Sequence, residues 1–113
     1  MVSLDKRGGV FVYDMKNLGE FKTLEANAPE ALKAFWAFDK AAMADGAIPS
    51  KYKELMALAV AFTTQCPYCI EIHAKKAREA GGSDQEISEV VAIVAALRAG
   101  AAMTHGTHAF KDR

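Results

Sequence analysis

Two cysteines stand at a spacing that could support thiol chemistry in the middle of the chain. Cys66 and Cys69 enclose Pro67 and Tyr68 in a Cys-x-x-Cys pair. Pro67 suits the first position of a helix, because its missing N–H would have no helical partner there. Cys66 is then the N-cap residue and Cys69 the third helical residue, so both sulfurs lie in the first turn. The dipole and free N–H groups of that turn favour a thiolate, and the spacing allows a small disulfide. The pair therefore predicts a redox dithiol.

A histidine and a glutamate are placed to serve this dithiol. His73 follows Cys69 by four residues, so the two side chains share a helix face, with Cβ atoms ~5–6 Å apart. An imidazole there can accept the thiol proton and stabilise the thiolate. Glu54 lies on the preceding predicted helix, and a hairpin brings it nearer to His73 than to the sulfurs. The remaining axial offset is roughly 8 Å at 1.5 Å per residue, which suits a long side chain and a bridging water. Glu54 is thus placed to orient or deprotonate His73.

The elements that must position these residues are four helices. Pro29 opens the first, and Gly46 is expected to end it. Ser50 is expected to cap the second. The third runs from Pro67 to the glycines at 81–82. Ser83 and Glu86 form a capping box at the start of the fourth, since each can satisfy the other's free backbone N–H.

Apolar residues at helical spacing give the first, second and fourth predicted helices a core-facing stripe. The predicted core positions are Leu32, Phe35, Trp36 and Met43 in the first helix, Leu55, Leu58, Ala59 and Phe62 in the second, and Ile87, Val90, Val91, Val94, Leu97 and Ala101 in the fourth. The fold class expected is therefore all-α, a single-domain helical bundle of four to five main helices. Residues 1–28 are expected to be a weakly structured N-terminal segment or short helix, with an extended stretch at 10–13, and residues 29–113 to be the core.

The amino-acid composition excludes a disordered chain and argues against a nucleic-acid-binding protein. The chain has 113 residues, of which 51% are hydrophobic and 25% charged, and this excludes a disordered chain. Its 14 Lys and Arg balance 14 Asp and Glu, whereas a nucleic-acid binder is expected to be basic. Zero net charge gives little repulsion between copies and is compatible with self-association.

The remaining composition features concern membranes and compartment. The longest apolar run, Leu55–Phe62, is far shorter than the ~20 residues of a membrane span. Met1–Arg7 contains no apolar stretch of a signal peptide. Two cysteines without an export signal indicate a reducing compartment, so we expect a cytoplasmic protein that meets neither membrane nor nucleic acid.

The whole constellation resembles the signature of a known family. Glu54-x11-Cys66-x2-Cys69-x3-His73 is similar to the motif of the alkyl hydroperoxidase D family, part of the carboxymuconolactone decarboxylase-like superfamily. Lys53-Glu54-Leu55 before the cysteines, residues 77–82 after them and a small-residue helix around Gly100 agree with it. The resemblance covers roughly residues 29–105. It is specific, because four residue types must match at fixed spacings.

The resemblance implies an all-α fold and a peroxidase or disulfide reductase that needs no cofactor or metal. It implies that Cys69 attacks a hydroperoxide, that Cys66 resolves the sulfenic acid into a disulfide, and that Glu54 and His73 form the proton relay. It further implies a lipoylated or thioredoxin-like carrier as reductant and a homo-oligomer, a hexamer or a trimer. The decarboxylase branch of the superfamily does not depend on a cysteine pair, so the pair favours thiol chemistry, with a decarboxylase-like enzyme as the alternative.

Two other interpretations of the cysteines are weighed against this one. Cys-Pro-Tyr-Cys also occurs in glutaredoxins, but that fold requires a strand directly before the motif, where this sequence has helical spacing. A structural zinc site could use Cys66 and Cys69 with His105 and His108. Its ligand pairs are 35 residues apart, which does not match the usual zinc spacings.

Overall fold

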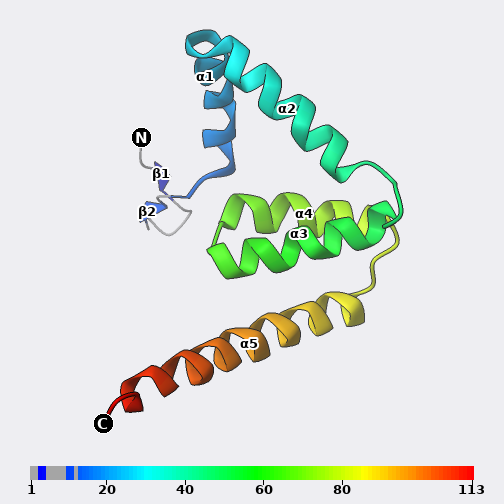
Figure 1. Ribbon diagram of the computed structural model, residues 1–113. Helices are drawn as coiled ribbons and strands as arrows, with labels where there is room; N and C mark the ends of the chain where they lie inside the picture. Colours follow the sequence, from blue (N-terminus) through cyan, green and yellow to red (C-terminus); the bar gives the residue numbers. More distant parts are fainter. Residues whose placement is uncertain (1–2, 5–9, 12) are drawn as a thin grey trace. The chain divides into compact units, whose positions relative to one another are not determined.

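A computed structural model describes residues 3–4, 10–11 and 13–113, and it confirms the all-α class (Figure 1). The elements are β1 (Ser3–Leu4), β2 (Val10–Phe11), the 3-10 helix η1 (Met15–Glu20), α1 (Phe21–Asn27), α2 (Pro29–Met43), α3 (Ser50–Thr64), α4 (Pro67–Glu79), α5 (Asp84–Gly106) and the 3-10 helix η2 (Thr107–Phe110). The chain forms two compact units, residues 1–47 and 48–113. The second unit contains the cysteines, and each unit is described by itself.

In the unit 48–113, α3 is the central helix and packs against both α4 and α5. Its core is small: the side chains of Leu58 and Ala77 are fully buried, and Leu55 is 9% exposed. The half-buried side chains around this core are Phe62, Ala74, Ile87 and Val90. Core burial of a leucine is worth roughly 1.5–3 kcal/mol, so the α3–α4 hairpin is the best-anchored part of this unit.

Two turns set the course of the chain around α4. Gln65 adopts a left-handed conformation (φ 57°) and ends α3, with its N–H donating to the carbonyl of Ala61. Gly81 has φ +96°, which L side chains rarely adopt. The next residue, Gly82, lies so close to α4 that an added Cβ would come within 2.8 Å of the Ala77 carbonyl oxygen. The two glycines are therefore needed to end α4 and turn the chain toward α5.

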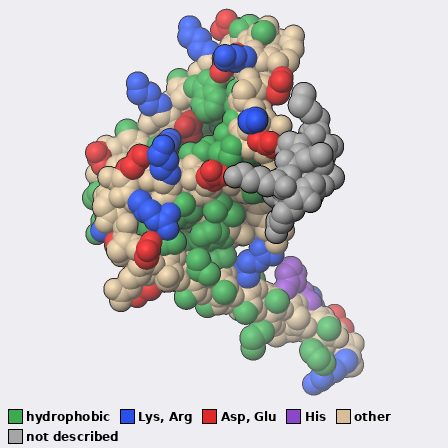
Figure 2. All heavy atoms as spheres, turned by 180° about the vertical axis from the view of Figure 1, so that it is seen from behind, with side chains coloured by type: hydrophobic (Ala, Val, Ile, Leu, Met, Phe, Trp, Pro, Cys, Tyr) green, Lys and Arg blue, Asp and Glu red, His purple; other side chains and the backbone are tan. Residues whose placement is uncertain are grey.

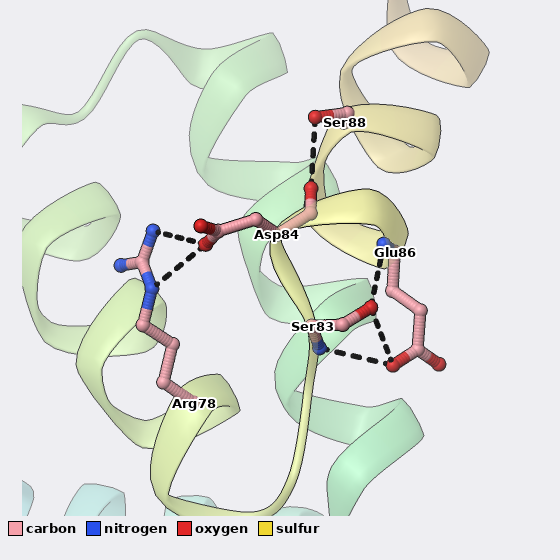
Figure 3. Close-up of polar contacts among 5 residues, drawn as sticks. All are labelled: Arg78, Ser83, Asp84, Glu86 and Ser88. Carbon is pink, nitrogen blue, oxygen red and sulfur yellow. Dashed lines mark hydrogen bonds and ion pairs between the residues drawn. The ribbon is translucent and has the colours of Figure 1, made fainter.

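The predicted capping box begins α5 (Figure 3). The Ser83 hydroxyl accepts from the Glu86 N–H at 3.0 Å, and the Glu86 carboxylate accepts from the Ser83 N–H at 3.0 Å. Lys51 of α3 forms an ion pair with the same carboxylate at 3.0 Å. The hydrogen bond from the Ser83 N–H and the contact with Lys51 lower the pKa of the Glu86 carboxyl. Arg78 of α4 also bonds Asp84 at 3.1 Å, so the start of α5 is fixed to both neighbouring helices.

Two predicted helix ends are wrong by one or two residues. Ser50 is the first residue of α3 and not its cap, because Pro49 holds the extended conformation of an N-cap (φ −62°, ψ 152°). The first predicted helix ends at Met43, before Gly46, because the backbone of Ala44 is already extended (ψ 152°). Neither shift moves a candidate site residue.

The predicted core stripe of the fourth helix is wrong over its second half. Ile87, Val90 and Val94 are partly buried, but Val91 is 49% and Leu97 69% exposed, and α5 has no fully buried residue. The physical reason is length, because α5 has 23 residues and α3, the helix it packs on, has 15. The segment Asp84–Phe110 is long and apolar enough to cross a membrane by length and composition alone, although none of its most apolar window is buried.

In the unit 1–47, η1 and α1 form short helices within residues 1–28, where a weakly structured segment or short helix is expected. Pro29 opens α2 as predicted, and Trp36 donates from its ring N–H to Glu25 of α1 at 3.2 Å. Phe35 and Trp36 were predicted as core and are 49% and 39% exposed. Only residues 10 and 11 of the expected extended stretch form a strand, pairing antiparallel with β1, while residue 12 lies outside the described residues. The predicted domain boundary at residue 28 stays a prediction.

Candidate active site

The two cysteines lie at the N-terminus of α4, as predicted. Cys66 is the N-cap residue, Pro67 occupies the first turn, and the Cys66 sulfur accepts a hydrogen bond from the Cys69 N–H at 3.3 Å. Both side chains are partly buried and both thiols are free. The left-handed turn at Gln65 allows this arrangement, because it ends α3 one residue before the cap. The cysteine pair therefore lies beside the backbone N–H groups of the first turn of α4, which stabilise a thiolate.

The two thiols differ in acidity. A hydrogen bond from the Cys69 thiol, with a further one from the Cys69 N–H, lowers the pKa of Cys66. The same thiol hydrogen bond, together with burial and the charge of a Cys66 thiolate, raises the pKa of Cys69 to about 11. In the reduced pair the first proton therefore leaves Cys66, and Cys69 keeps its own.

Glu54 and His73 meet across the α3–α4 hairpin. The Oε2 atom of Glu54 lies 2.6 Å from Nδ1 of His73. Glu54 is 6% exposed, and the His73 side chain is 23% exposed. A buried carboxylate is costly without a partner, and the imidazole supplies one. The carboxylate holds Nδ1 and so leaves Nε2 as the ring nitrogen for proton exchange.

This contact corrects one sequence expectation. A side chain plus a bridging water were expected to span the offset between Glu54 and His73, whereas the two side chains touch directly. The expected offset of the two side chains holds for straight, parallel helices that begin at the cysteines. In the structure, residue 65 already turns the chain back, so the two helices start their return closer together. The glutamate is therefore a direct hydrogen-bond partner of the histidine.

The structure brings the four predicted site residues onto one hairpin but does not bring the histidines of the zinc alternative to them. His105 and His108 lie in α5 and η2, with ring centroids 5.0 Å apart. Among the described residues no three His, Cys, Asp or Glu side chains gather in a way that could hold a metal ion. The strand that a glutaredoxin requires before the motif is replaced by α3. Both rival arrangements are thus unsupported within this chain.

One residue near the site escaped the sequence analysis. Arg98 of α5 donates to the Thr63 carbonyl at 2.8 Å, in the last turn of α3 just before the dithiol. It satisfies a carbonyl that the helix end leaves without a helical partner. A single arginine in an apolar helix belongs to no motif, so its hydrogen bond to the end of α3 could not be predicted from the sequence.

With the hairpin and its four residues in place, the chain can be assigned to a class. It belongs to the carboxymuconolactone decarboxylase family, whose model matches residues 29–112. This family includes enzymes and related alkyl hydroperoxidase-like folds. The match confirms the resemblance seen in the sequence.

Relatives and solved structures agree with this assignment. An uncharacterized protein of the cox locus of Paracoccus denitrificans is 44% identical over 92 residues, covering 81% of this chain and 80% of its own. A crystal structure from Methanobacterium thermoautotrophicum superposes with a TM-score of 0.73 at 31% identity, over 78% of this chain and 99% of that one. An apo carboxymuconolactone decarboxylase family protein from Legionella pneumophila gives a TM-score of 0.68 at 28% identity, over 73% of each chain.

Proposed function

We propose that the chain is a thiol-dependent peroxidase and disulfide oxidoreductase that reduces hydroperoxides through Cys66 and Cys69. One observation carries the proposal: a dithiol at a helix N-terminus shares a hairpin with a buried Glu54–His73 pair 2.6 Å apart. A purely structural cysteine pair would not need a carboxylate-oriented base on the same helix. The substrate class is an organic hydroperoxide.

The reaction proceeds in two steps on the protein. Cys69 gives its proton to His73, its thiolate attacks the outer oxygen of the hydroperoxide, and the O–O bond breaks. The leaving alkoxide takes the proton from His73 and departs as the alcohol. Cys69 is now a sulfenic acid, oxidised by two electrons. The Cys66 thiolate then attacks the Cys69 sulfur, the S–S bond forms, and the sulfenic hydroxyl leaves as hydroxide. The hydroxide takes up a proton from solvent, equivalent to the one that Cys66 released, and becomes water. A dithiol carrier donates two electrons and two protons to restore both thiols.

The acidities give each group a task in this scheme. Because the pKa of Cys69 is raised to about 11, its thiol is nearly all protonated near pH 7 and needs a base before it can attack. His73 follows Cys69 by four residues on α4 and is oriented by Glu54. The lowered pKa of Cys66 favours the thiolate form of the resolving group. The relay and the cysteine roles in this scheme stay proposals.

The reductant and compartment are part of the same proposal. A lipoylated or thioredoxin-like carrier fits a protein that forms a disulfide within one helical turn, and the reducing cytoplasm would supply it. A carboxymuconolactone decarboxylase-like reaction remains the second candidate, and family membership is the observation that favours it.

Matched cysteine variants test the proposal. We expect the wild-type protein to consume an alkyl hydroperoxide with dithiothreitol as reductant, and Cys69→Ser to lose this activity. Cys66→Ser should form a sulfenic acid at Cys69, trapped by dimedone and located by mass spectrometry, but should not turn over. If Cys69→Ser forms the sulfenate instead, the roles are reversed. Absence of peroxide consumption by the wild type, with decarboxylation of a muconolactone retained in the double serine variant, would overturn the proposal.

A further inference from the structure

Two histidines lie where α5 passes into the 3-10 helix η2. The chain has three histidines, and His73 is the one in the candidate active site. His105 stands in the last turn of α5, and His108 belongs to η2. The proposed peroxidase scheme makes no use of this pair. Its position at the junction of two helix types decides how the two rings meet.

The backbone tightens between these two histidines. Gly106 and Thr107 have ψ angles of −24° and −23°, which are typical of a 3-10 helix. In a 3-10 helix the side chains of residues three apart lie one above the other. The Thr107 hydroxyl donates to the Thr104 carbonyl at 2.7 Å and so holds this turn. The tightened turn therefore brings the imidazoles of His105 and His108 together.

The two imidazole rings lie close together at the surface. Their centroids are 5.0 Å apart, and the ring planes are inclined by 52°. Both residues are exposed. Among the described residues, each ring contacts the other ring and forms no hydrogen bond or ion pair. The ring nitrogens are therefore available to a ligand from solution.

The same two side chains line a hollow in the surface. The hollow has a volume of about 540 Å³, and the other residues around it are Leu97, Gly100, Ala101 and Thr104. Figure 2 shows hydrophobic side chains along α5 close to the histidines near its C-terminal end. Because most of these neighbours are small, there is room beside the imidazoles for an ion and the water molecules that it carries.

We propose that His105 and His108 together bind one divalent transition-metal ion of the group Ni²⁺, Cu²⁺ and Zn²⁺. Imidazole nitrogen is a ligand that suits all three ions, and it binds Zn²⁺ at about 2.0–2.1 Å. Two rings with centroids 5.0 Å apart are close enough to share one ion. Water fills the remaining positions, since no third His, Cys, Asp or Glu side chain of the described residues joins the pair.

A site with two protein ligands is an open one. Structural zinc sites have four protein ligands and catalytic zinc sites three. Here the first imidazole to bind presents the ion to the second at a high effective concentration, which favours the pair over a single histidine. The ion is thus held more weakly than in a structural zinc site and keeps positions for further ligands. The proposal depends neither on the cysteines nor on the peroxidase activity.

Nickel titration of matched variants tests the pair. The background is Cys66→Ser/Cys69→Ser, because thiolates bind the same ions. By isothermal titration calorimetry with Ni²⁺, we expect one ion per chain. His105→Gln and His108→Gln should each weaken binding by at least about tenfold, since losing a group that only supports a metal ligand already costs about 10–100-fold. Met103→Gln is the control, since Met103 is 77% exposed on the same helix and lies outside the hollow.

Two further measurements report on the same pair. Electron paramagnetic resonance of the background loaded with Cu²⁺ should show nitrogen ligation, which the His105→Gln/His108→Gln double variant should lose. Ni²⁺ should raise the melting temperature of the background but not that of the double variant, because an ion that binds only the folded chain stabilises it. Circular dichroism without metal should report the same helix content for all variants.

Several outcomes of the titration would overturn the proposal. Absence of Ni²⁺ binding, or equal binding by the background and the double variant, rejects the site. A loss in only one of the two single variants would mean contact with one histidine, and an equal loss in Met103→Gln would mean a general effect on the helix. Binding that is lost only in His73→Gln would assign the ion to the Glu54–His73 pair. One ion per two chains would replace the site within one chain by a bridge between copies.

Discussion

The α3–α4 hairpin and the C-terminal half of α5 differ in how much of their structure one chain completes. The hairpin contains the buried core and closes the Glu54–His73 contact within itself. The C-terminal half of α5 is apolar, yet all its residues from Ala95 onward are exposed. The difference teaches that the candidate site is assembled by local chain reversal, whereas the C-terminal half of α5 leaves its apolar side chains exposed.

The largest effect expected in the hairpin is the difference in reactivity between its two thiols. At pH 8 the thiolate fraction of Cys69 is about 10⁻³, since its pKa is raised to about 11, whereas the pKa of Cys66 is lowered. We expect iodoacetamide to alkylate Cys66 first and Cys69 only as the pH rises toward 11, as followed by peptide mass spectrometry. In Cys66→Ser the main cause of the raised pKa is gone, so Cys69 should react at lower pH. An unchanged Cys69 profile in that variant would show that burial alone sets its acidity.

Core stability should separate the buried from the exposed positions of α3 in the hairpin. Leu58 is fully buried in α3, and Leu58→Ala should lower the free energy of unfolding by about 2–5 kcal/mol, measured by urea denaturation. Met56→Ala, two residues earlier and 52% exposed, is the control and should stay within about 0.5 kcal/mol. Similar costs at the two sites would mean that Met56 is covered in solution.

The proton relay should have a somewhat smaller effect. Removing the charge in Glu54→Gln should slow the peroxide step by about 10²-fold, which corresponds to about 2.7 kcal/mol. His73→Gln should be at least as harmful, and the double variant far less than additive, because both residues serve one proton path. Stopped-flow peroxide consumption measures all three. Glu71→Gln, on the exposed face of α4, is the control. Fully additive effects would separate Glu54 from His73.

The smallest effect on the free energy of unfolding is expected at the start of α5, the helix that leads away from the hairpin. Ser83→Ala removes one hydrogen bond of the capping box that begins α5 and should cost about 1 kcal/mol of unfolding free energy. Ser88→Ala is the control, since its hydroxyl bonds only the Asp84 carbonyl inside the helix. A thermal melt of both variants checks this. Equal losses would mean that the cap adds nothing beyond an ordinary surface hydroxyl.

Much of the fold could be predicted from the sequence, because the residues that start helices act locally. Pro29 and Pro67 open helices, and Ser83 with Glu86 forms its capping box, because these signals act within one helical turn. The placement of Cys66 as N-cap follows from the same rule, and the all-α class from the apolar periodicity. The end of α2 and the cap of α3 were misplaced by one or two residues, since backbone angles at Ala44 and Pro49 are set by the connecting segment.

The sequence by itself thus determined which four residues share the hairpin and which helices hold them, because spacing along a helix fixes the face and the turn. Only the tertiary structure decided that Glu54 touches His73 directly, since the left-handed turn at Gln65 sets how closely α4 returns along α3. It also decided which thiol is more acidic, because that depends on the hydrogen bond between the two sulfurs. Periodicity marked Leu97 as a core residue, and only the lengths of α3 and α5 showed that the core ends before it.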